Sequence, residues 1–273
     1  IVAMTIEEAE NAAIQMLSGD SFGDAGKKIV IEDYLEGEEI SFIVITDGKT
    51  ILPLATSQDH KAKNDGDTGP NTGGMGAYSP AINNKKIEQK IINEIIQPTL
   101  NGMRLDGHPY LGFLYAGLMI LPDGTPKVIE FNCRLGDPET QPILMRFKSD
   151  LPLTCLSVIN GTLSKETVEW DTRAALGVVL AAGGYPVDYK TGEVIEGLEQ
   201  VNTKFQKVFH AGTNSKNGSI KTDGGRVLCV VGLGDSVTLA AKNAYDAVDK
   251  IYWDKVFYRR DIGHHAISRE KKQ

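Results

Sequence analysis

The residues with the clearest chemical potential lie between Glu130 and Arg134. Glu130, Asn132 and Arg134 are spaced two apart, and this spacing puts side chains on one face of a β-strand. Carboxylate and amide oxygens suit Mg²⁺, and a nearby guanidinium can hold the charge on a transferred phosphoryl group. The spacing therefore favours a magnesium-nucleotide site, although a half-exposed strand with its polar residues facing water would show the same pattern.

The residues that follow add a possible anion site. Asp137 is predicted to cap a helix, with Pro138 at its first position. Free backbone N–H groups and a favourable dipole at such a helix start would stabilise a phosphate or a carboxylate. This arrangement favours the functional interpretation of the strand end.

A long polar stretch from Ser57 to Pro80 is rich in glycine, hydroxyl and amide groups. Loops of this length in compact domains are usually functional or disordered. Its glycines allow close approach of the backbone to a ligand, but no Gly-Lys-Ser/Thr follows, so it is not a Walker loop. From the residues alone, it is either a substrate cradle or a solvated loop.

Two further segments have alternative interpretations. The stretch from Glu32 to Glu39 could offer its backbone to a purine and a carboxylate to a ribose, or it could be an acidic connecting turn. The stretch from Val231 to Val237 resembles a dinucleotide fingerprint, but Val237 replaces the third glycine. The five histidines show no ligand pattern, and the pair His264–His265 is predicted to be an exposed turn.

The elements that would position these residues follow from local patterns. Helices are predicted from Thr5 through Leu17, around Ile87 to Ile96 with Pro98 kinking or ending the helix, after Asp137, from about Ser149 to Gly161, and from about Ser236 to Trp253. Strands are predicted at 28–35 and 173–182, with hairpins 39–46/49–55 across Asp47-Gly48 and 112–121/126–132 across Asp123-Gly124. A domain boundary is placed near residue 169.

Composition excludes several classes of protein. The 273 residues carry 29 Lys+Arg against 36 Asp+Glu, a net charge of -7, which disfavours nucleic acid as a partner. The apolar runs are too short to cross a bilayer, so we expect no membrane partner. Three scattered cysteines favour reduced thiols and a cytoplasmic protein, and the start at Ile1 resembles a cut inside a domain.

Four strings together carry a family resemblance: "EDYLEGEEISF", "ATSQDHK", "DTGPNTGGMGAYSP" and "EFNCRLGDPETQP". The chain resembles the phosphoribosylamine–glycine ligases (glycinamide ribonucleotide synthetases) of the ATP-grasp superfamily, from Ile1 almost to Gln273. The resemblance implies an α+β chain with an ATP-grasp fold and a β-rich C-terminal domain like that of biotin carboxylase. Residues 1–35 would be the remainder of the small lobe, 36–168 the large lobe and 169–273 the C-terminal domain. Family members are longer at the N-terminus, so we expect a fragment with little or no ligase activity alone.

The resemblance also implies roles for individual residues. Glu130 and Asn132 would bind Mg²⁺ or Mn²⁺, and Arg134, Lys61 and Asp59 would be catalytic. ATP would lie on Glu32, Asp33, Tyr34, Leu35 and Glu39. The substrate side would include Thr68, Gly69, Asn71, Thr72, Gly73, Gly74, Met75, Gly76, Ser79 and Asp137. The segment 115–118 offers no further acidic metal ligand.

The implied reaction joins glycine to 5-phosphoribosylamine through glycyl phosphate, giving glycinamide ribonucleotide, ADP and phosphate in purine biosynthesis. Its partners would be these small molecules, and we expect a monomer. Two alternatives remain open at this point. The chain could be a non-catalytic nucleotide-binding module, or a dinucleotide-dependent enzyme built on the turn at Gly232 to Gly234.

Overall fold

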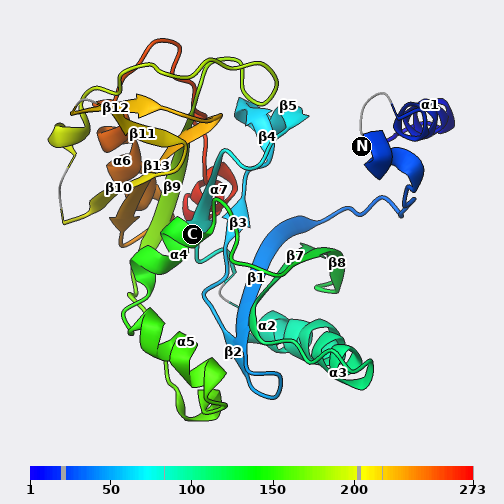
Figure 1. Ribbon diagram of the computed structural model, residues 1–273. Coiled ribbons are helices and arrows are strands. Elements are labelled where there is room, and N and C mark those ends of the chain that lie inside the picture. Colours follow the sequence, from blue (N-terminus) through cyan, green and yellow to red (C-terminus); the bar gives the residue numbers. More distant parts are fainter. Residues whose placement is uncertain (20–22, 83, 202–203, 217, 273) are drawn as a thin grey trace. The chain divides into compact units, whose positions relative to one another are not determined.

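The computed structural model describes residues 1–19, 23–82, 84–201, 204–216 and 218–272, in two compact units, Ile1–Gly37 and Glu38–Gln273 (Figure 1). The first unit contains helix α1 (Ile6–Leu17), which begins with the predicted capping box. Thr5 Oγ1 accepts from the Glu8 backbone N–H, and the Glu8 carboxylate accepts from the Thr5 backbone N–H, both at 3.2 Å. A short 3₁₀ turn, Gly23–Lys27, follows.

The strand predicted over residues 28–35 is not formed. Within the described residues no strand pairs with this segment, and a strand needs a partner to satisfy its backbone groups. Val30 and Ile31, whose β-branched side chains suggested the strand, are 83% and 85% exposed. Their type favoured a strand, but no neighbouring strand completes it.

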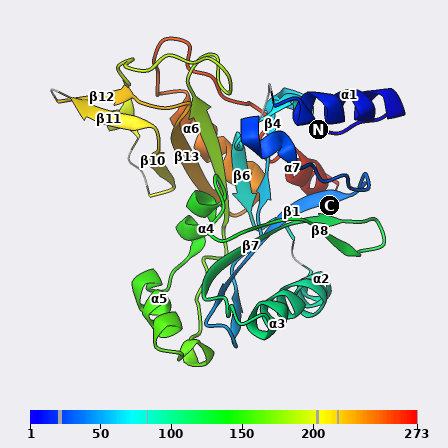
Figure 2. The same ribbon diagram turned by 45° about the vertical axis from the view of Figure 1, so that its right-hand side comes forward.

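The second unit begins with a four-stranded antiparallel sheet in the order β2 (Ile51–Pro53), β1 (Glu38–Thr46), β7 (Gly112–Ile120) and β8 (Pro126–Asn132). Both predicted hairpins are therefore confirmed. One face of this sheet buries Ile40, Phe42 and Val44 of β1 against helices α2 (Lys85–Ile91) and α3 (Gln97–Leu105). Figure 2 shows the two helices along that side of the sheet.

Pro98 is predicted to kink or end the helix, and of these two effects the end is wrong, because α3 runs on through Pro98. A wide turn of π-helical type, Ile92–Ile96, joins α2 to α3, and Pro98 lies in the first turn of α3. The wide turn relaxes the regular hydrogen-bond pattern in which proline cannot take part. Thr99 Oγ1 donates to the Ile95 carbonyl oxygen at 2.7 Å, so this carbonyl has a partner.

A second antiparallel sheet has the order β10 (Gln206–His210), β13 (Arg226–Gly234), β9 (Ala174–Ala181), β6 (Gly76–Ser79) and β3 (Gln58–Asp59). The predicted strand at 173–182 is confirmed as β9. Helix α6 (Val237–Val248) packs on this sheet, with Trp253 buried in the same core (Figures 1 and 2). The sheet joins strands from both sides of residue 169, because β6 pairs with β9.

Gly232 and Gly234 lie inside β13 rather than in a dinucleotide-binding turn. Strand β13 is antiparallel to both its neighbours, so the parallel βαβ unit that such a turn requires is absent here. A Cβ atom at Gly232 would lie 2.3 Å from the Ala240 carbonyl oxygen of α6, and one at Gly234 would lie 2.4 Å from the Ala240 nitrogen. These glycines let the helix pack closely on the strand, and the dinucleotide hypothesis is wrong at this place.

The helix predicted to start at Asp137–Pro138 starts later, as α4 (Thr140–Arg146), with Glu139 at its N-cap position and no side-chain cap. Asp137 pairs instead with Arg226. Helix α5 (Leu151–Ile159) begins as predicted, after Asp150, whose carboxylate accepts from the Leu153 N–H at 2.9 Å. The other named elements are β4 (Ala62–Asn64), β5 (Thr68–Asn71), β11 (Thr213–Lys216), β12 (Ser219–Thr222), α7 (His264–Glu270) and the 3₁₀ turns Asp65–Asp67, Leu163–Lys165 and Leu198–Gln200. Among the described residues, no helix is both long and apolar enough for a membrane span.

Candidate active site

The strand register of the first sheet aligns the predicted metal ligands with polar partners. Ser41 of β1 faces Gly117 of β7, and Gly117 faces Glu130 of β8. The next row pairs Tyr115 with Asn132. Because side chains alternate between faces and cross-strand partners share a face, Glu130 and Asn132 lie on the same side of the sheet as Ser41.

Gly117 leaves the space that the Glu130 side chain occupies. A Cβ atom at position 117 would lie 3.2 Å from Glu130 Cγ. Beside it, Ser41 Oγ donates to Glu139 Oε1 at 2.6 Å and lies 3.0 Å from the Tyr115 hydroxyl. Glu139 is 2% exposed, so a buried carboxylate lies close to the row of polar side chains.

Lys61 joins this group from the second sheet. It follows β3 and forms an ion pair with Glu39 of β1. Burial alone would lower the pKa of Lys61, but the charge of Glu39 and its hydrogen bond, with further contributions from Asp59 and Glu130, raise that pKa above its usual value. Lys61 therefore stays charged, and the charges of these carboxylates stabilise it.

Asp59 is an acid of the group with a perturbed pKa. Burial, followed by repulsion from the Glu139 carboxylate, raises the pKa of Asp59 well above its usual value. Its Oδ1 atom is buried and has no hydrogen-bond partner in the described part of the chain. A buried oxygen without a partner is costly unless a proton, water or cation satisfies it. We call Glu39, Asp59, Glu130, Glu139 and Lys61 the acidic cluster.

The acidic cluster holds four carboxylates, which offer oxygen ligands, and one lysine, which offers a positive charge. Hard divalent cations such as Mg²⁺ prefer oxygen ligands, and nucleotide phosphates complete their coordination. The donor set, with the adjacent Asn132 amide, therefore fits a Mg²⁺ or Mn²⁺ ion.

Arg134 lies beyond the end of β8, and its side chain is exposed. Its Nη1 atom donates to the Leu135 carbonyl oxygen at 2.8 Å. Glu130 is also exposed, whereas Asn132 is half-buried. Glu130, Asn132 and Arg134 are thus close in sequence, but the described contact of the Arg134 guanidinium is with a neighbouring backbone carbonyl and not with a carboxylate.

Residues 68–79, which we call the glycine-rich segment, change from exposed to buried along their length. Thr68, Gly69 and Asn71 belong to β5 and are exposed. Thr72 Oγ1 donates to the Lys61 carbonyl oxygen at 2.9 Å and accepts from the Gly74 N–H at 3.0 Å. The residues that follow are buried, namely Met75, Gly76 and Ser79, the last two in β6.

Position 74 must be glycine, because no side chain would fit there. Its φ is +108°, and a Cβ atom there would lie 2.3 Å from Pro138 Cδ and 2.7 Å from Asp59 Oδ1. The glycine-rich segment can therefore pass directly over Asp59 and Pro138. This close approach connects the segment with the acidic cluster.

Arg226 joins the site from a distant part of the chain and is not predicted from the sequence. It opens β13, and its Nη2 atom contacts Asp137 Oδ2 at 2.6 Å, while Nη1 donates to the Gly73 carbonyl oxygen. Tyr185 Oη accepts from the Gly73 N–H at 3.0 Å. The signal in the sequence was an arginine directly after two glycines and before an apolar strand, but nothing local links it to Asp137.

A cavity of about 330 Å³ lies beside Arg226. Asp137, Gln141, Tyr185 and Tyr189 line it together with Arg226. Gln141 Oε1 is buried without a hydrogen-bond partner in the described chain. The cavity therefore offers an arginine, an amide and hydroxyl groups, which suits a small polar ligand.

The predicted nucleotide-binding residues belong to two different compact units, and the histidine pair lies in a third place, at the start of α7. Glu32, Asp33, Tyr34 and Leu35 belong to the first unit, and Glu39 to the second. The pair His264–His265 is not an exposed turn as predicted, because it begins helix α7 and lies beside Asp67. No sequence pattern could reveal that contact between residues so far apart in the chain.

Comparison with known proteins agrees with this architecture. Residues 1–140 match the sequence model described as phosphoribosylglycinamide synthetase, ATP-grasp (A) domain, and residues 175–265 match the C domain of the same synthetase. Biotin carboxylase domains share the fold at low identity: that of a thermophilic 2-oxoglutarate carboxylase aligns over 92% of this chain and 54% of its own, with a TM-score of 0.63 and 15% identity. The chain thus has an ATP-grasp fold.

Closer relatives carry one name. Phosphoribosylamine–glycine ligase of Vibrio parahaemolyticus is 58% identical over 100% of this chain and 64% of its own length, and that of Allochromatium vinosum is 59% identical over 99% and 64%. The crystal structure of the Thermotoga maritima enzyme of this name superposes with a TM-score of 0.81 and 36% identity, over 93% of this chain and 64% of the other. The chain belongs to the phosphoribosylglycinamide synthetase family. It spans just under two thirds of the length of these curated relatives.

Proposed function

We propose that this chain supplies the ATP-grasp and C-terminal parts of a phosphoribosylamine–glycine ligase. The observation that carries the proposal is the acidic cluster, in which Lys61 pairs with Glu39 and is also influenced by the charges of Asp59 and Glu130, at the strand end that bears Glu130 and Asn132. Phosphoryl transfer depends mainly on positioning and on neutralising oxygens, so it needs oxygen ligands and cations rather than a nucleophilic side chain. The family relationship selects the reaction among those that such a site could perform.

In the proposed reaction, a carboxylate oxygen of glycine attacks the γ-phosphorus of ATP, and ADP leaves. The amine nitrogen of 5-phosphoribosylamine then attacks the carbonyl carbon of glycyl phosphate. Phosphate leaves, the amine loses a proton, and glycinamide ribonucleotide is formed. Phosphorylation is required because the negative charge of a free carboxylate repels the amine and an oxide is a poor leaving group.

We propose Glu130 and Asn132 as ligands of Mg²⁺ or Mn²⁺. A bound divalent cation would neutralise charge on the phosphate oxygens during transfer. The Glu130 side chain passes over Gly117, and Asn132 lies in the next row on the same face. The unpartnered Oδ1 of Asp59 adds one more buried oxygen of this cluster that a cation or a proton would satisfy.

For the nucleotide, we propose that the backbone of 32–35 contacts the adenine and that Glu39 meets the ribose. Glu39 holds Lys61 in the structure, so ribose hydroxyls would compete with Lys61 for this carboxylate. A displaced Lys61 would be available for an anionic group of ATP or glycine. Asp59 and Arg134 complete the proposed catalytic set on the amino-acid and acyl-phosphate side.

The substrate side is proposed to include the exposed Thr68, Gly69 and Asn71 and the turn from Thr72 through Gly74. Asp137 joins it through Arg226, beside the cavity of about 330 Å³. Buried residues of the same segment would act by holding the loop rather than by touching a substrate. These are Met75, Gly76 and Ser79, of which Ser79 donates to the Thr56 carbonyl oxygen at 2.8 Å.

We further propose that the protein acts as a monomer in the cytoplasm, on small molecules only. Its three cysteines, Cys133, Cys155 and Cys229, are free thiols, which suits a reducing compartment. Burial raises the pKa of the Cys229 thiol to about 12, so this cysteine is unreactive.

The test joins the chain to the portion of the Vibrio parahaemolyticus relative that the match leaves uncovered. We expect formation of glycinamide ribonucleotide that requires ATP, glycine and 5-phosphoribosylamine together. Glu130→Gln and Asn132→Ala should shift the Mg²⁺ dependence of turnover to higher concentrations while leaving circular dichroism unchanged. Glu94→Gln, an exposed carboxylate on the wide turn between α2 and α3, is the matched control. Unchanged metal dependence in both site variants would remove them from the metal site, and absence of product in the joined protein would reject the function.

A further inference from the structure

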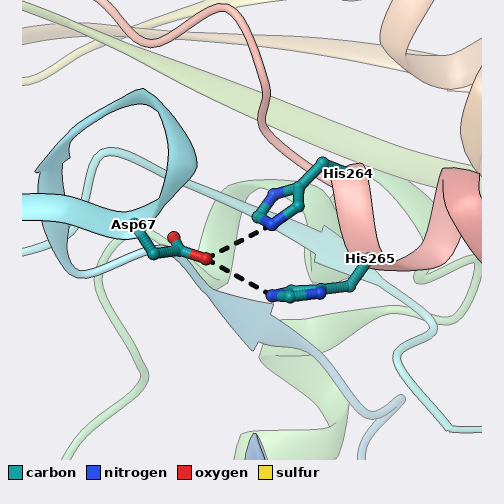
Figure 3. Close-up of side chains that lie close together, drawn as sticks. All are labelled: Asp67, His264 and His265. Atoms are coloured by element: carbon teal, nitrogen blue, oxygen red, sulfur yellow. Dashed lines mark ion pairs between the residues drawn. The ribbon is translucent and has the colours of Figure 1, made fainter.

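A second group of possible metal ligands lies apart from the acidic cluster. Asp67 ends the short turn between β4 and β5, and His264 and His265 begin α7. Their ligand atoms all lie within 4.8 Å of one another. Figure 3 shows one carboxylate oxygen of Asp67 facing both rings, and this Oδ2 atom is 3.3 Å from each Nε2 atom.

The hydrogen bonds of His264 decide which ring nitrogen has a free lone pair. Its Nδ1 atom lies 3.1 Å from the Asp261 carbonyl oxygen, and a carbonyl can only accept. Nδ1 therefore carries the hydrogen, and in the neutral ring Nε2 presents a lone pair to Asp67. Two acceptors facing each other repel unless a proton or a metal ion lies between them.

The distances favour a metal ion. A charge-assisted hydrogen bond between a ring nitrogen and a carboxylate is typically about 2.7–2.9 Å long, shorter than the 3.3 Å found at both histidines. Tetrahedral zinc with bonds of about 2.0–2.1 Å separates its ligand atoms by about 3.3–3.4 Å. We propose that Asp67, His264 and His265 bind Zn²⁺, with water as the fourth ligand.

The surrounding residues hold the three ligands in place. Arg259 is buried and contacts Asp67 Oδ1 at 2.9 Å, which leaves Oδ2 for the ion. His60 Nε2 accepts from the Gly263 N–H at 3.1 Å and so fixes the start of α7. Partners of this kind orient metal ligands and fix the tautomer of ligating histidines.

The charge around the site can also accept a divalent cation. Asp67 and Asp261 both contact Arg259, and Asp65 accepts from the Arg260 backbone N–H at 2.9 Å. The carboxylates of Asp67 and Asp261 neutralise the positive charge of Arg259. The exposed Arg260 side chain pairs with Asp249 at 3.5 Å. Two carboxylates on one buried guanidinium, with Asp65 next to them on the Arg260 backbone, leave a negative balance.

Nitrogen ligands distinguish this site from the acidic cluster. Two imidazoles and one carboxylate select Zn²⁺ over Mg²⁺, which prefers oxygen. The site is also open, since the His265 side chain is 55% exposed and that of Asp67 is 40% exposed. A zinc ion here would link the turn before the glycine-rich segment to the C-terminal helix α7.

The experiment uses metal-free protein, so it needs no turnover and can fail independently of the proposed ligase function. Titration with Co²⁺ in the presence of millimolar Mg²⁺, which occupies the oxygen ligands of the acidic cluster, should give one equivalent of binding, with the visible absorption of a tetrahedral N/O site and no thiolate charge-transfer band. Zn²⁺ should displace Co²⁺, whereas millimolar Mg²⁺ should not. Zn²⁺ should also raise the melting temperature, because a ligand that binds the folded state stabilises it.

His265→Ala is the decisive variant, because the described contacts of this side chain are those with Asp67 and His264. It should keep its circular dichroism and weaken Co²⁺ binding by at least about 100-fold, since loss of even an outer-shell partner costs 10–100-fold. His108→Ala, an exposed histidine, is the control and should bind like the parent. Absence of stoichiometric binding, or equal affinity in His265→Ala, would overturn the proposal and leave a protonated ion pair as the explanation of the contact.

Discussion

Replacement of Arg259 by methionine should destabilise the protein more than any exposed arginine change. Arg259 is 1% exposed and contacts Asp261 through Nε at 2.7 Å and through Nη2 at 2.8 Å, in addition to Asp67. Its Nη1 atom also donates to the Ala62 carbonyl oxygen at 3.1 Å. The guanidinium therefore links the β4–β5 hairpin to the segment before α7.

The magnitude follows from what the change leaves behind. Removing one partner of a buried ion pair typically costs about 3–5 kcal/mol, because the other charge stays buried without compensation. The side chains of Asp261 and Asp67 are 22% and 40% exposed and keep part of their hydration, so we take the lower end, about 3 kcal/mol. For a domain of this size, that corresponds to a fall in melting temperature of about 6–12 °C.

The assay is urea and thermal unfolding followed by tryptophan fluorescence, since Trp253 is buried in the core that α6 covers. The matched control is Arg260→Met, whose exposed ion pair with Asp249 is 3.5 Å long and should contribute less than about 0.5 kcal/mol. If Arg259→Met melts within about 2 °C of this control, the reasoning about the buried guanidinium is refuted.

Three further changes test other parts of the structure. In the joined protein, Arg134→Lys should lower single-turnover phosphoryl transfer by about 10²–10³, and a normal rate would assign this arginine to the surface. Ser41→Ala should lower the free energy of unfolding by about 1–3 kcal/mol, because the buried Glu139 loses a donor at 2.6 Å. Urea unfolding at constant metal concentration measures this loss, and an unchanged free energy would contradict the prediction. Asp171→Asn should cost about 1 kcal/mol near pH 7, since hydrogen bonds from Arg173 lower the pKa of Asp171 to about 2. Because the folded pKa is lowered, this difference is present above about pH 4 and should vanish as the pH falls through 2; a pH-independent difference would count against it.

Local signals predicted much of the fold correctly. Both hairpins turn on Asp-Gly pairs, and Gly48 and Gly124 adopt φ values of +86° and +80° that favour glycine. The capping box of α1 is equally local. Predictions failed where distant partners decide the outcome, as for residues 28–35, which have strand-like side chains and no paired strand in the described chain.

The candidate site was predictable to the extent that it follows the two-residue period of a strand. Glu130 and Asn132 share a face because they lie on one strand. The role of Glu139 cannot be predicted from local patterns, because its contact with Ser41 spans 98 positions. Arg226 and Asp137 are 89 positions apart, so their pairing also depends on the tertiary fold.

The acidic cluster combines residues from both sheets of the second unit. Glu39 and Glu130 come from the first sheet, whereas Asp59 and Lys61 come from the end of β3 in the second. The sheets are joined where Ser41 and Ser57 exchange backbone hydrogen bonds of 2.8 and 3.2 Å. These bonds fix β1 against the segment entering β3, which brings Glu39 of the first sheet beside Lys61, the residue that follows β3 and His60. A site assembled in this way resists the mutual repulsion of its carboxylates, because separating them would require separating the two sheets.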